Sequence, residues 1–281
     1  MVKNELKSAC CLICLAWAAS TSVHAQTTLS LDGPWMFAET SIYQGDSCQT
    51  VQAVIDTGCT TCVVDSAYAA DRLGVVIDSL DSINVNTSSQ RLQQRIFILD
   101  SLSFCGMSFQ GRRCIVSNLK RQFKQYAPNF IVGANVLGYS AWKFDLHRKV
   151  IEPWEIGKRT GGSIVKFKLD DFWRPLIRCK VNGVKVDMIF DTGARYCKLT
   201  SGIYKGNTDT IMKETANLAK ELTMTEAEKC SDVLFEAGKF SQRMDFVIDP
   251  SIRQGLLNID FFHQRSFILD YKKKVIEILE D

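Results

Sequence analysis

A short segment occurs twice in this sequence, and it constrains the fold more than any other feature. Residues 53–58 read Ala-Val-Ile-Asp-Thr-Gly, and residues 187–193 read Asp-Met-Ile-Phe-Asp-Thr-Gly. In each copy, an apolar run typical of a buried strand ends in an aspartate and a tight Thr-Gly turn. The two aspartates, Asp56 and Asp191, are 135 residues apart. Two copies in matching surroundings predict paired carboxylates that meet at a pseudo-twofold axis.

Further matches extend the repeat beyond the two motifs. Cys62 follows Asp56 by six residues, and Cys197 follows Asp191 by the same number. Each half then closes with an apolar pair and a charged hairpin, the pairs being 131–132 and 256–257. Constant order with small changes in spacing indicates one duplicated plan. We expect a first lobe over residues 26–152, a linker rich in Gly and Pro over 153–162, and a second lobe over 163–281.

Local patterns favour a mainly β protein. The strands are short and β-branched, with turn signals every eight to twelve residues. Residues 177–186 predict a hairpin around Asn182-Gly183, because both residue types tolerate positive φ. Residues 68–74 predict a short helix that ends at Gly74. Residues 210–229, rich in Ala, Glu, Lys and Met, predict a helix on composition.

The N-terminus predicts export. Lys3 and Lys7 precede an apolar segment over residues 9–19, and Val23-His24-Ala25 offers small residues at the two positions that signal peptidases read. We therefore expect residues 1–25 to be a signal peptide and the mature protein to be secreted or periplasmic. The apolar segment is too short to span a bilayer comfortably, and no later segment is long enough. A net charge of +3 without any block of five or six like charges argues against a nucleic-acid partner.

Eight of the eleven cysteines follow the expected signal peptide. An even number in an exported protein predicts disulfides, although eight cysteines allow 105 pairings and the connectivity stays open. Local candidates are Cys59 with Cys62, and Cys105 with Cys114 across a hairpin. The Cys59–Cys62 pair is also a CxxC motif, which leaves disulfide exchange as an alternative. No second CxxC or histidine pair completes a zinc site, so neither a metal nor another cofactor is expected.

The two Asp-Thr-Gly segments, with Ile131-Val132-Gly133 and the entry hairpin of the second half, resemble the pepsin and retropepsin superfamily of aspartic proteases. The resemblance covers nearly all of the mature chain and is strongest at the two motifs. It implies two similar β-barrel-like lobes of the acid protease type with a cleft between them. It also implies peptide hydrolysis by Asp56 and Asp191 acting as a pair.

The resemblance also assigns supporting positions around each aspartate. It implies that the hydroxyls of Thr57 and Thr192 cross-link the two loops, and that Gly58 and Gly193 let backbone N–H groups approach the carboxylates. Further support is expected from three residues, Ala194, Gly133 and Asn258. Two departures stand out: Cys59 replaces the usual Ser, Thr or Ala, and Asn258 occupies the position that Gly133 has in the first half. A thiol is a poor hydrogen-bond donor, so support for Asp56 is expected to be weaker.

A flap is expected over the cleft. Its strands are assigned to residues 83–85 and 96–98, and its polar tip to Thr87, Ser88, Ser89 and Gln90. Polar tip residues can bond a substrate backbone and exclude water. Because residues 210–229 are predicted to be helical, one flap is expected, as in pepsin-like chains.

The sequence therefore predicts a monomeric aspartic endopeptidase that acts on peptides or proteins. An amide resists water, so a site must activate the water and polarise the carbonyl together. Two close carboxylates that share one proton can do both. The alternative is a catalytically inactive two-lobed protein that binds peptides. Cleavage preference and pH optimum are not given by these patterns.

Overall fold

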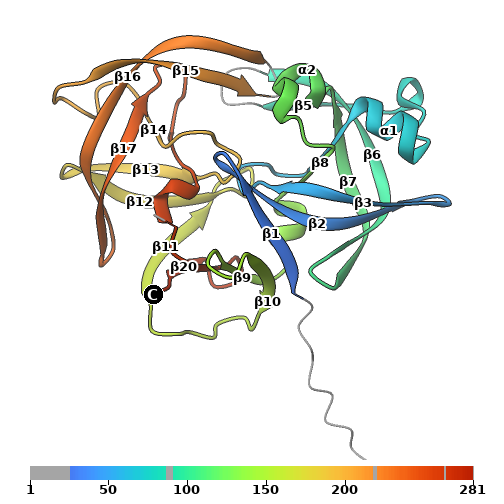
Figure 1. The fold of residues 1–281 in the computed structure, drawn as a ribbon, viewed down its shortest axis with the longest axis horizontal. Coiled ribbons are helices and arrows are strands. Elements are labelled where there is room, and N and C mark those ends of the chain that lie inside the picture. The colour runs from blue at the N-terminus through green and yellow to red at the C-terminus, as the bar shows by residue number, and fades with distance from the viewer. Residues whose placement is uncertain (1–25, 87–90, 218–219, 263, 281) are drawn as a thin grey trace, which may run out of the picture.

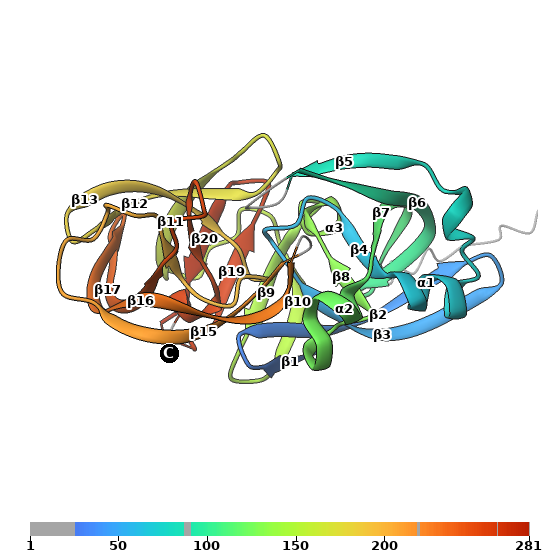
Figure 2. The ribbon, with the colours of Figure 1, turned by 90° about the horizontal axis from the view of Figure 1, so that it is seen from above.

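The computed structural model describes residues 26–86, 91–217, 220–262 and 264–280. The expected signal peptide, residues 1–25, lies outside the described residues, as do Thr87, Ser88, Ser89 and Gln90. Within the described part, the structure is mainly β, as expected. Figure 1 shows the C-terminal half on the left and the N-terminal half on the right, and Figure 2 shows them side by side from above.

The first half contains ten strands, three short α-helices and two 3-10 helices among the described residues. The elements are β1 (Thr27–Asp32), β2 (Trp35–Gln44), β3 (Ser47–Ile55), β4 (Cys62–Asp65), α1 (Ser66–Leu73), a 3-10 helix (Ile77–Ser79), β5 (Ser82–Asn86), β6 (Arg91–Phe104), β7 (Met107–Ser117), α2 (Leu119–Phe123), a 3-10 helix (Lys124–Tyr126), β8 (Phe130–Val132), α3 (Ala134–Leu137), β9 (Ala141–Asp145) and β10 (Val150–Trp154).

The second half repeats the strands and omits most of the helices within the described residues. The elements are β11 (Ser163–Leu169), β12 (Pro175–Val181), β13 (Val184–Phe190), β14 (Lys198–Leu199), β15 (Asp209–Asn217), β16 (Lys220–Ala237), β17 (Phe240–Ile248), β18 (Gly255–Leu257), a 3-10 helix (Ile259–Phe262), β19 (Phe267–Asp270) and β20 (Val275–Ile278).

The strand pairings confirm the duplication that the sequence repeat predicts. In the first half, β3 pairs with β8 in parallel and β4 pairs with β7 in parallel. In the second half, β13 pairs with β18 and β14 pairs with β17 in the same parallel sense. The antiparallel pairs β2–β3 and β6–β7 recur as β12–β13 and β16–β17. These strands of one half therefore have partners with the same pairing in the other.

One shared sheet joins the two halves beneath the loops that follow β3 and β13. Its order is β1, β10, β9, β19, β20, β11, and the β9–β19 pair crosses from one half to the other. Phe144 faces Phe267 across that pair, with ring centroids 4.5 Å apart and nearly parallel planes. Both rings belong to one continuous apolar core that spans the two halves. Burial of such large rings stabilises this contact strongly.

Two local predictions are confirmed. β12 and β13 form the expected hairpin, and its turn residues Asn182 and Gly183 have φ values of 46° and 81°. α1 begins after Asp65, whose carboxylate accepts from the N–H of Tyr68, and ends at Gly74 in the left-handed conformation. These signals are local and depend on backbone preferences at single positions.

The helix predicted over residues 210–229 is wrong, because β15 and β16 form a long antiparallel hairpin there. Many of its described side chains are exposed; Met212 and Met224 keep 58% and 56% of their surface. The inward positions are few, and one of them holds a buried Lys213. Cross-strand pairing thus overrides a composition that favours a helix.

The expected linker is partly strand and partly anchored loop. Its first residues, Pro153 and Trp154, belong to β10. The N–H groups of Thr160, Gly161 and Gly162 all donate to the carboxylate of Glu277 at 2.8–3.0 Å. The segment between the halves is therefore fixed to β20.

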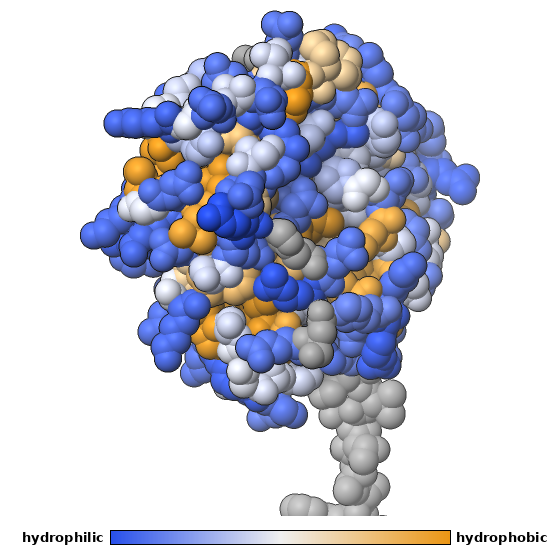
Figure 3. Space-filling model, turned by 60° about the vertical axis from the view of Figure 1, so that its left-hand side comes forward, coloured by the Kyte–Doolittle hydropathy of each residue, from blue (hydrophilic) through white to orange (hydrophobic). Residues whose placement is uncertain are grey.

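The surface mixes polar and apolar side chains. On the face shown in Figure 3, hydrophobic residues form several small groups between hydrophilic ones. Alternation along exposed strands produces this distribution, since successive side chains point to opposite faces. No helix among the described residues has the length and apolar character needed to cross a bilayer.

Candidate active site

Asp56 and Asp191 occupy equivalent positions at the ends of β3 and β13. The N–H of Asp56 donates to the carbonyl of Val132 at 3.0 Å, and that of Asp191 donates to Leu257 at 2.8 Å. These bonds extend the parallel pairs β3–β8 and β13–β18 by one residue. Each strand therefore delivers its aspartate into a loop whose start is fixed by the neighbouring parallel strand.

The two loops are joined at their base by Thr57 and Thr192. The N–H of each threonine donates to the hydroxyl of the other at 3.1 Å. The hydroxyl of Thr57 donates to the carbonyl of Phe190 at 2.7 Å, and that of Thr192 donates to Ile55 at 2.6 Å. Both side chains are fully buried. The cross-link implied by the family resemblance is thus present, as four reciprocal hydrogen bonds.

Gly58 and Gly193 leave room for the opposite carboxylate. A Cβ atom on Gly58 would lie 2.3 Å from Cγ of Asp191, and one on Gly193 would lie 2.4 Å from Cγ of Asp56. Each glycine N–H also donates to the carboxylate two residues earlier, at 2.8 Å and 3.0 Å. A side chain at either position would displace a carboxylate. The close approach of the halves therefore requires glycine at both sites.

The carboxyl groups of Asp56 and Asp191 lie close together, because each packs against the glycine whose N–H binds the other carboxylate. Burial raises the pKa of Asp56 well above its usual value, and the charge of Asp191 raises it further. Burial also raises the pKa of Asp191, but the hydrogen bond from Asp56 and the positive charges of Arg174 and Lys198 oppose that shift. The two groups titrate as a pair, and the raised pKa values favour a state in which the pair keeps one proton.

Gly133 supports the first loop from below. A Cβ atom there would lie 2.5 Å from the carbonyl oxygen of Thr61. This contact lets the next N–H groups, of Ala134 and Asn135, donate to the carbonyls of Cys59 and Thr60 at 2.8 Å and 3.0 Å. The short helix α3 is thereby attached to the loop that carries Asp56.

Asn258 supports the second loop with its side chain instead. It is fully buried, and its amide donates to the carbonyl of Arg195 at 3.1 Å. Its side-chain oxygen accepts from the thiol of Cys197 at 2.9 Å. The loop also closes on itself, because the N–H of Ala194 donates to the carbonyl of Asp191 at 3.0 Å. The departure at position 258 therefore replaces backbone contacts with side-chain ones.

The disulfides proposed for Cys59–Cys62 and Cys105–Cys114 are not formed. All eight described cysteines are free thiols. Cys105 occupies the β6–β7 turn, whereas Cys114 lies along β7 opposite Phe97. The neighbour of Cys114 is Cys62, its register partner on β4.

Cys59 lines the cleft beside the carboxyl pair. Burial raises the pKa of its thiol well above the usual value, and the charges of Asp56 and Asp191 raise it further. Thiol–disulfide exchange needs a thiolate, which such surroundings disfavour. The geometry therefore argues against the redox alternative.

Two residues that the sequence analysis did not identify close the site at the second loop. The indole N–H of Trp35 donates to the carbonyl of Gly193 at 2.9 Å. The guanidinium of Arg195 lies 5.1 Å from the Trp35 ring and 4.6 Å from the Tyr126 ring, and it forms an ion pair with Glu214. Only the position of Arg195, four residues after Asp191, could have drawn attention to it. Trp35 gives no local signal.

A cleft of about 680 Å³ surrounds the carboxyl pair and is lined by both halves. Val85 on β5 and Arg91 on β6 line it, so the described part of the first hairpin borders the cleft as expected. Glu214 and Thr215 on β15 line it from the second half, so a second hairpin occupies the equivalent place. The expectation of a single flap is wrong for the same reason as the predicted helix.

The second hairpin reaches the first half. Arg121 on α2 forms an ion pair with Glu221 on β16, and β15 and β16 both contact α2. Figure 1 shows these strands arching over the top of the molecule toward α2. The cleft is therefore bordered at one end by an arm that bridges the two halves.

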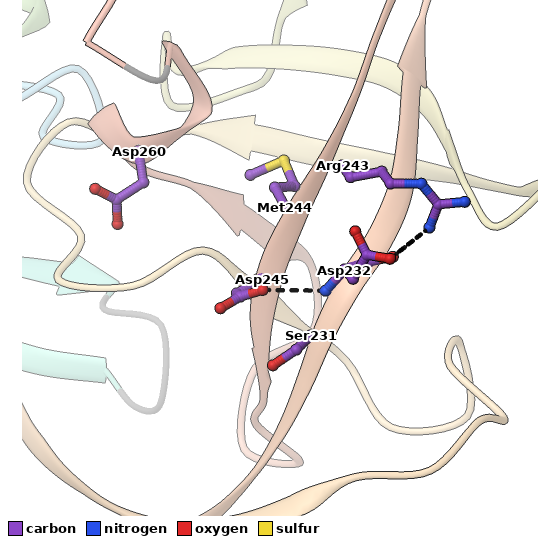
Figure 4. Close-up of a pocket in the computed structure, with 6 residues that line it drawn as sticks. All are labelled: Ser231, Asp232, Arg243, Met244, Asp245 and Asp260. Carbon is purple, nitrogen blue, oxygen red and sulfur yellow. Dashed lines mark hydrogen bonds and ion pairs between the residues drawn. The ribbon is translucent and has the colours of Figure 1, made fainter.

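A separate hollow lies outside the cleft, between β16, β17 and the helical turn at residues 259–262. Figure 4 shows Asp232 between Asp245 and Arg243, with Asp260 set apart. The N–H of Asp232 donates to Asp245 at 3.1 Å, and its carboxylate accepts from Arg243 at 2.9 Å. These contacts stabilise the irregular register at residues 230–233 of β16.

Comparison with protein families matches a part of the first half. A comparison with curated proteins finds no match. The segment from residue 40 to residue 140, which contains Asp56 and its supporting Gly133, matches the model of the aspartyl protease family. This match supports an aspartyl protease family for the chain.

Proposed function

We propose that this protein is an aspartic endopeptidase of the pepsin and retropepsin type, with lobes over residues 26–152 and 163–281. The observation that carries the proposal is the close approach of the buried carboxyl groups of Asp56 and Asp191, in loops joined by reciprocal threonine bonds. The family match supports peptidase chemistry. The repeated strand pairing supports a second loop equivalent to the first.

The proposed reaction begins with a water molecule held between the two carboxyl groups. The ionised carboxylate takes a proton from the water, and the oxygen attacks the amide carbon. The protonated carboxyl group donates to the carbonyl oxygen and stabilises the charge that develops there. A proton then passes to the amide nitrogen, and the C–N bond breaks to give a carboxylic acid and an amine.

The charges around the two aspartates differ. Burial raises the pKa of both carboxyl groups, and at Asp191 the positive charges of Arg174 and Lys198 partly offset that rise. The two groups titrate as a pair, so neither the role of general base nor that of hydrogen-bond donor is assigned to one aspartate alone.

The substrate is proposed to be an extended peptide across the cleft. Val85, Ile115 and Ile131 offer apolar side chains on one wall. The hairpins β5–β6 and β15–β16 border the cleft and supply edge backbone groups, which suit recognition of an extended chain. The mature protein is proposed to be an exported monomer that begins at Gln26, and N-terminal sequencing of exported protein tests that start.

Single substitutions test the dyad. Asp56→Asn and Asp191→Asn each remove one carboxyl group at constant size, and both are expected to abolish cleavage of a mixed peptide library. Asp171→Asn, at an exposed position, is the matched control and should cleave normally. A peptide mimic with a hydroxyl in place of the attacked carbonyl should block the wild type. Full cleavage by either dyad variant refutes the proposal, and peptide binding without cleavage by the wild type favours the inactive alternative.

A further inference from the structure

The two halves have equivalent backbone around the cleft but differ in one side chain. Strand register relates the pairs Val54–Ile131 and Val63–Ile131 in the first half to Ile189–Leu256 and Lys198–Leu256 in the second. Two of the three equivalent positions, Val54 with Ile189 and Ile131 with Leu256, are apolar in both halves. The third is Val63 in the first half and Lys198 in the second. A cation therefore replaces an apolar side chain in one wall.

Lys198 belongs to a buried cluster with more positive than negative charge. Oδ2 of Asp249 accepts from Nζ of Lys198 at 3.0 Å and from Nζ of Lys213 at 3.3 Å. Oδ1 of Asp249 accepts from the hydroxyl and the N–H of Ser251 at 2.6 Å and 3.0 Å. The carboxylate is thus saturated by four donors. Two lysines share this carboxylate, and each ammonium group has three N–H donors. The lysines therefore carry more N–H donors than Asp249 can accept.

The cluster faces the reacting centre. Lys198 and Asp249 line the same cleft as the two aspartates, and the side chain of Lys198 is 15% exposed. The charge of Lys198 acts on Asp191. Arg253 is exposed and lines the same cleft. Glu214, another acid that lines the cleft, forms an ion pair with Arg195. On the opposite wall, Ile131 lines the cleft and belongs to a separate apolar cluster that also contains the fully buried Val63.

We propose that the second-half wall around Lys198 is a specificity subsite for an acidic side chain next to the scissile bond, with an apolar side chain against the first-half wall. The inference rests on the proposed peptidase function and adds the substrate class. A substrate carboxylate would accept a charge-assisted hydrogen bond from Nζ of Lys198, and it would balance the extra positive charge of the cluster. A neutral amide of the same size offers only a weaker bond.

Pairs of peptides that differ only in a side-chain carboxylate or amide test the subsite. Two pairs are needed, Phe-Glu against Phe-Gln and Glu-Phe against Gln-Phe, because they cover both directions of the chain across the cleft. In one pair, the wild type is expected to favour Glu over Gln in kcat/KM by about tenfold, the effect of one bond to a charged group. Lys198→Met should reduce this ratio to about one. Lys166→Met, an exposed lysine outside the cleft, makes the same charge change and should leave the ratio as in the wild type.

A binding measurement separates failure of the subsite from failure of the proposed function. The same peptide pairs with a reduced amide bond cannot be cleaved, and calorimetry reports their affinity for the wild type and for Lys198→Met. A preference for Glu that Lys198→Met removes supports the subsite whether or not cleavage occurs. Equal affinity for Glu and Gln in the wild type, or a preference that survives Lys198→Met, overturns it.

Discussion

Thr57 and Thr192 bind each other symmetrically beneath the two aspartates. Each N–H donates to the hydroxyl of the other at 3.1 Å, and each hydroxyl donates to a carbonyl of the opposite strand at 2.7 Å or 2.6 Å. No solvent reaches these groups. The position of one carboxylate is therefore fixed relative to the other by bonds that cross between the halves.

Removal of one hydroxyl should weaken both the fold and the site. Thr57→Val keeps the shape of the side chain but leaves the N–H of Thr192 and the carbonyl of Phe190 buried without a partner. We expect a loss of about 2–4 kcal/mol of unfolding free energy and at least a tenfold lower kcat. Thr57→Ser keeps the hydroxyl and is the matched control. Denaturant unfolding and peptide cleavage measure both effects, and a stable, active Thr57→Val would contradict this role.

The dyad should destabilise the fold as pH rises. The folded-state pKa of Asp56 lies above its unfolded value, mainly through burial and then through the charge of Asp191. Its contribution is fully favourable below the unfolded pKa of about 4 and is lost as pH rises through the folded value. Asn carries no charge at any pH, so Asp56→Asn avoids the free-energy cost of ionising a buried carboxyl group. The variant should therefore raise Tm by a few degrees at pH 7 and by less at pH 4. A lower Tm at pH 7 would contradict the shift.

Asp249 should show the opposite dependence. Burial alone would raise its pKa, but bonds from Ser251 and the charges of Lys198 and Lys213 more than offset that effect and hold it below the usual value. Its contribution is present above the unfolded pKa of about 4 and is lost as pH falls. Asp249→Asn leaves two buried lysines without a carboxylate and should cost about 3–5 kcal/mol at pH 7. The cost should shrink in strong acid; a cost independent of pH would contradict the account.

The thiols should be free and unequally reactive. Cys48 is exposed, whereas Cys62, Cys105 and Cys114 are buried, and burial raises the pKa of Cys105 to about 12. A maleimide reagent should label Cys48 first in the native protein. After unfolding without reductant, all eight cysteines from Cys48 onward should react, as counted by mass spectrometry. Fewer labels would reveal disulfides and contradict the free-thiol structure.

The motifs at the two aspartates and their order along the chain could be predicted from sequence, because each depends on local turns and a repeated plan. The helix predicted at residues 210–229 was wrong, because side-chain composition does not register cross-strand partners such as those of β15 and β16. Trp35 and Arg195 were missed for a related reason. Their role comes from contacts 158 residues apart in the chain, as in the bond from Trp35 to Gly193.

The number of cysteines did not predict which of them lie next to each other in the fold. An even count predicts disulfides, but pairing depends on which side chains meet, and Cys114 meets Cys62 rather than Cys105. The specificity of the second wall also escaped the sequence. The role proposed for Lys198 depends on strand register, which pairs it with Leu256 in the position that Val63 has in the first half.

The most direct measurement is a crystal structure with a bound peptide mimic whose hydroxyl replaces the attacking water. The account predicts carboxyl oxygens of Asp56 and Asp191 within about 3 Å of each other, with the hydroxyl within hydrogen-bond reach of both. Carboxyl groups separated beyond that reach, or a mimic bound away from the pair, would contradict it.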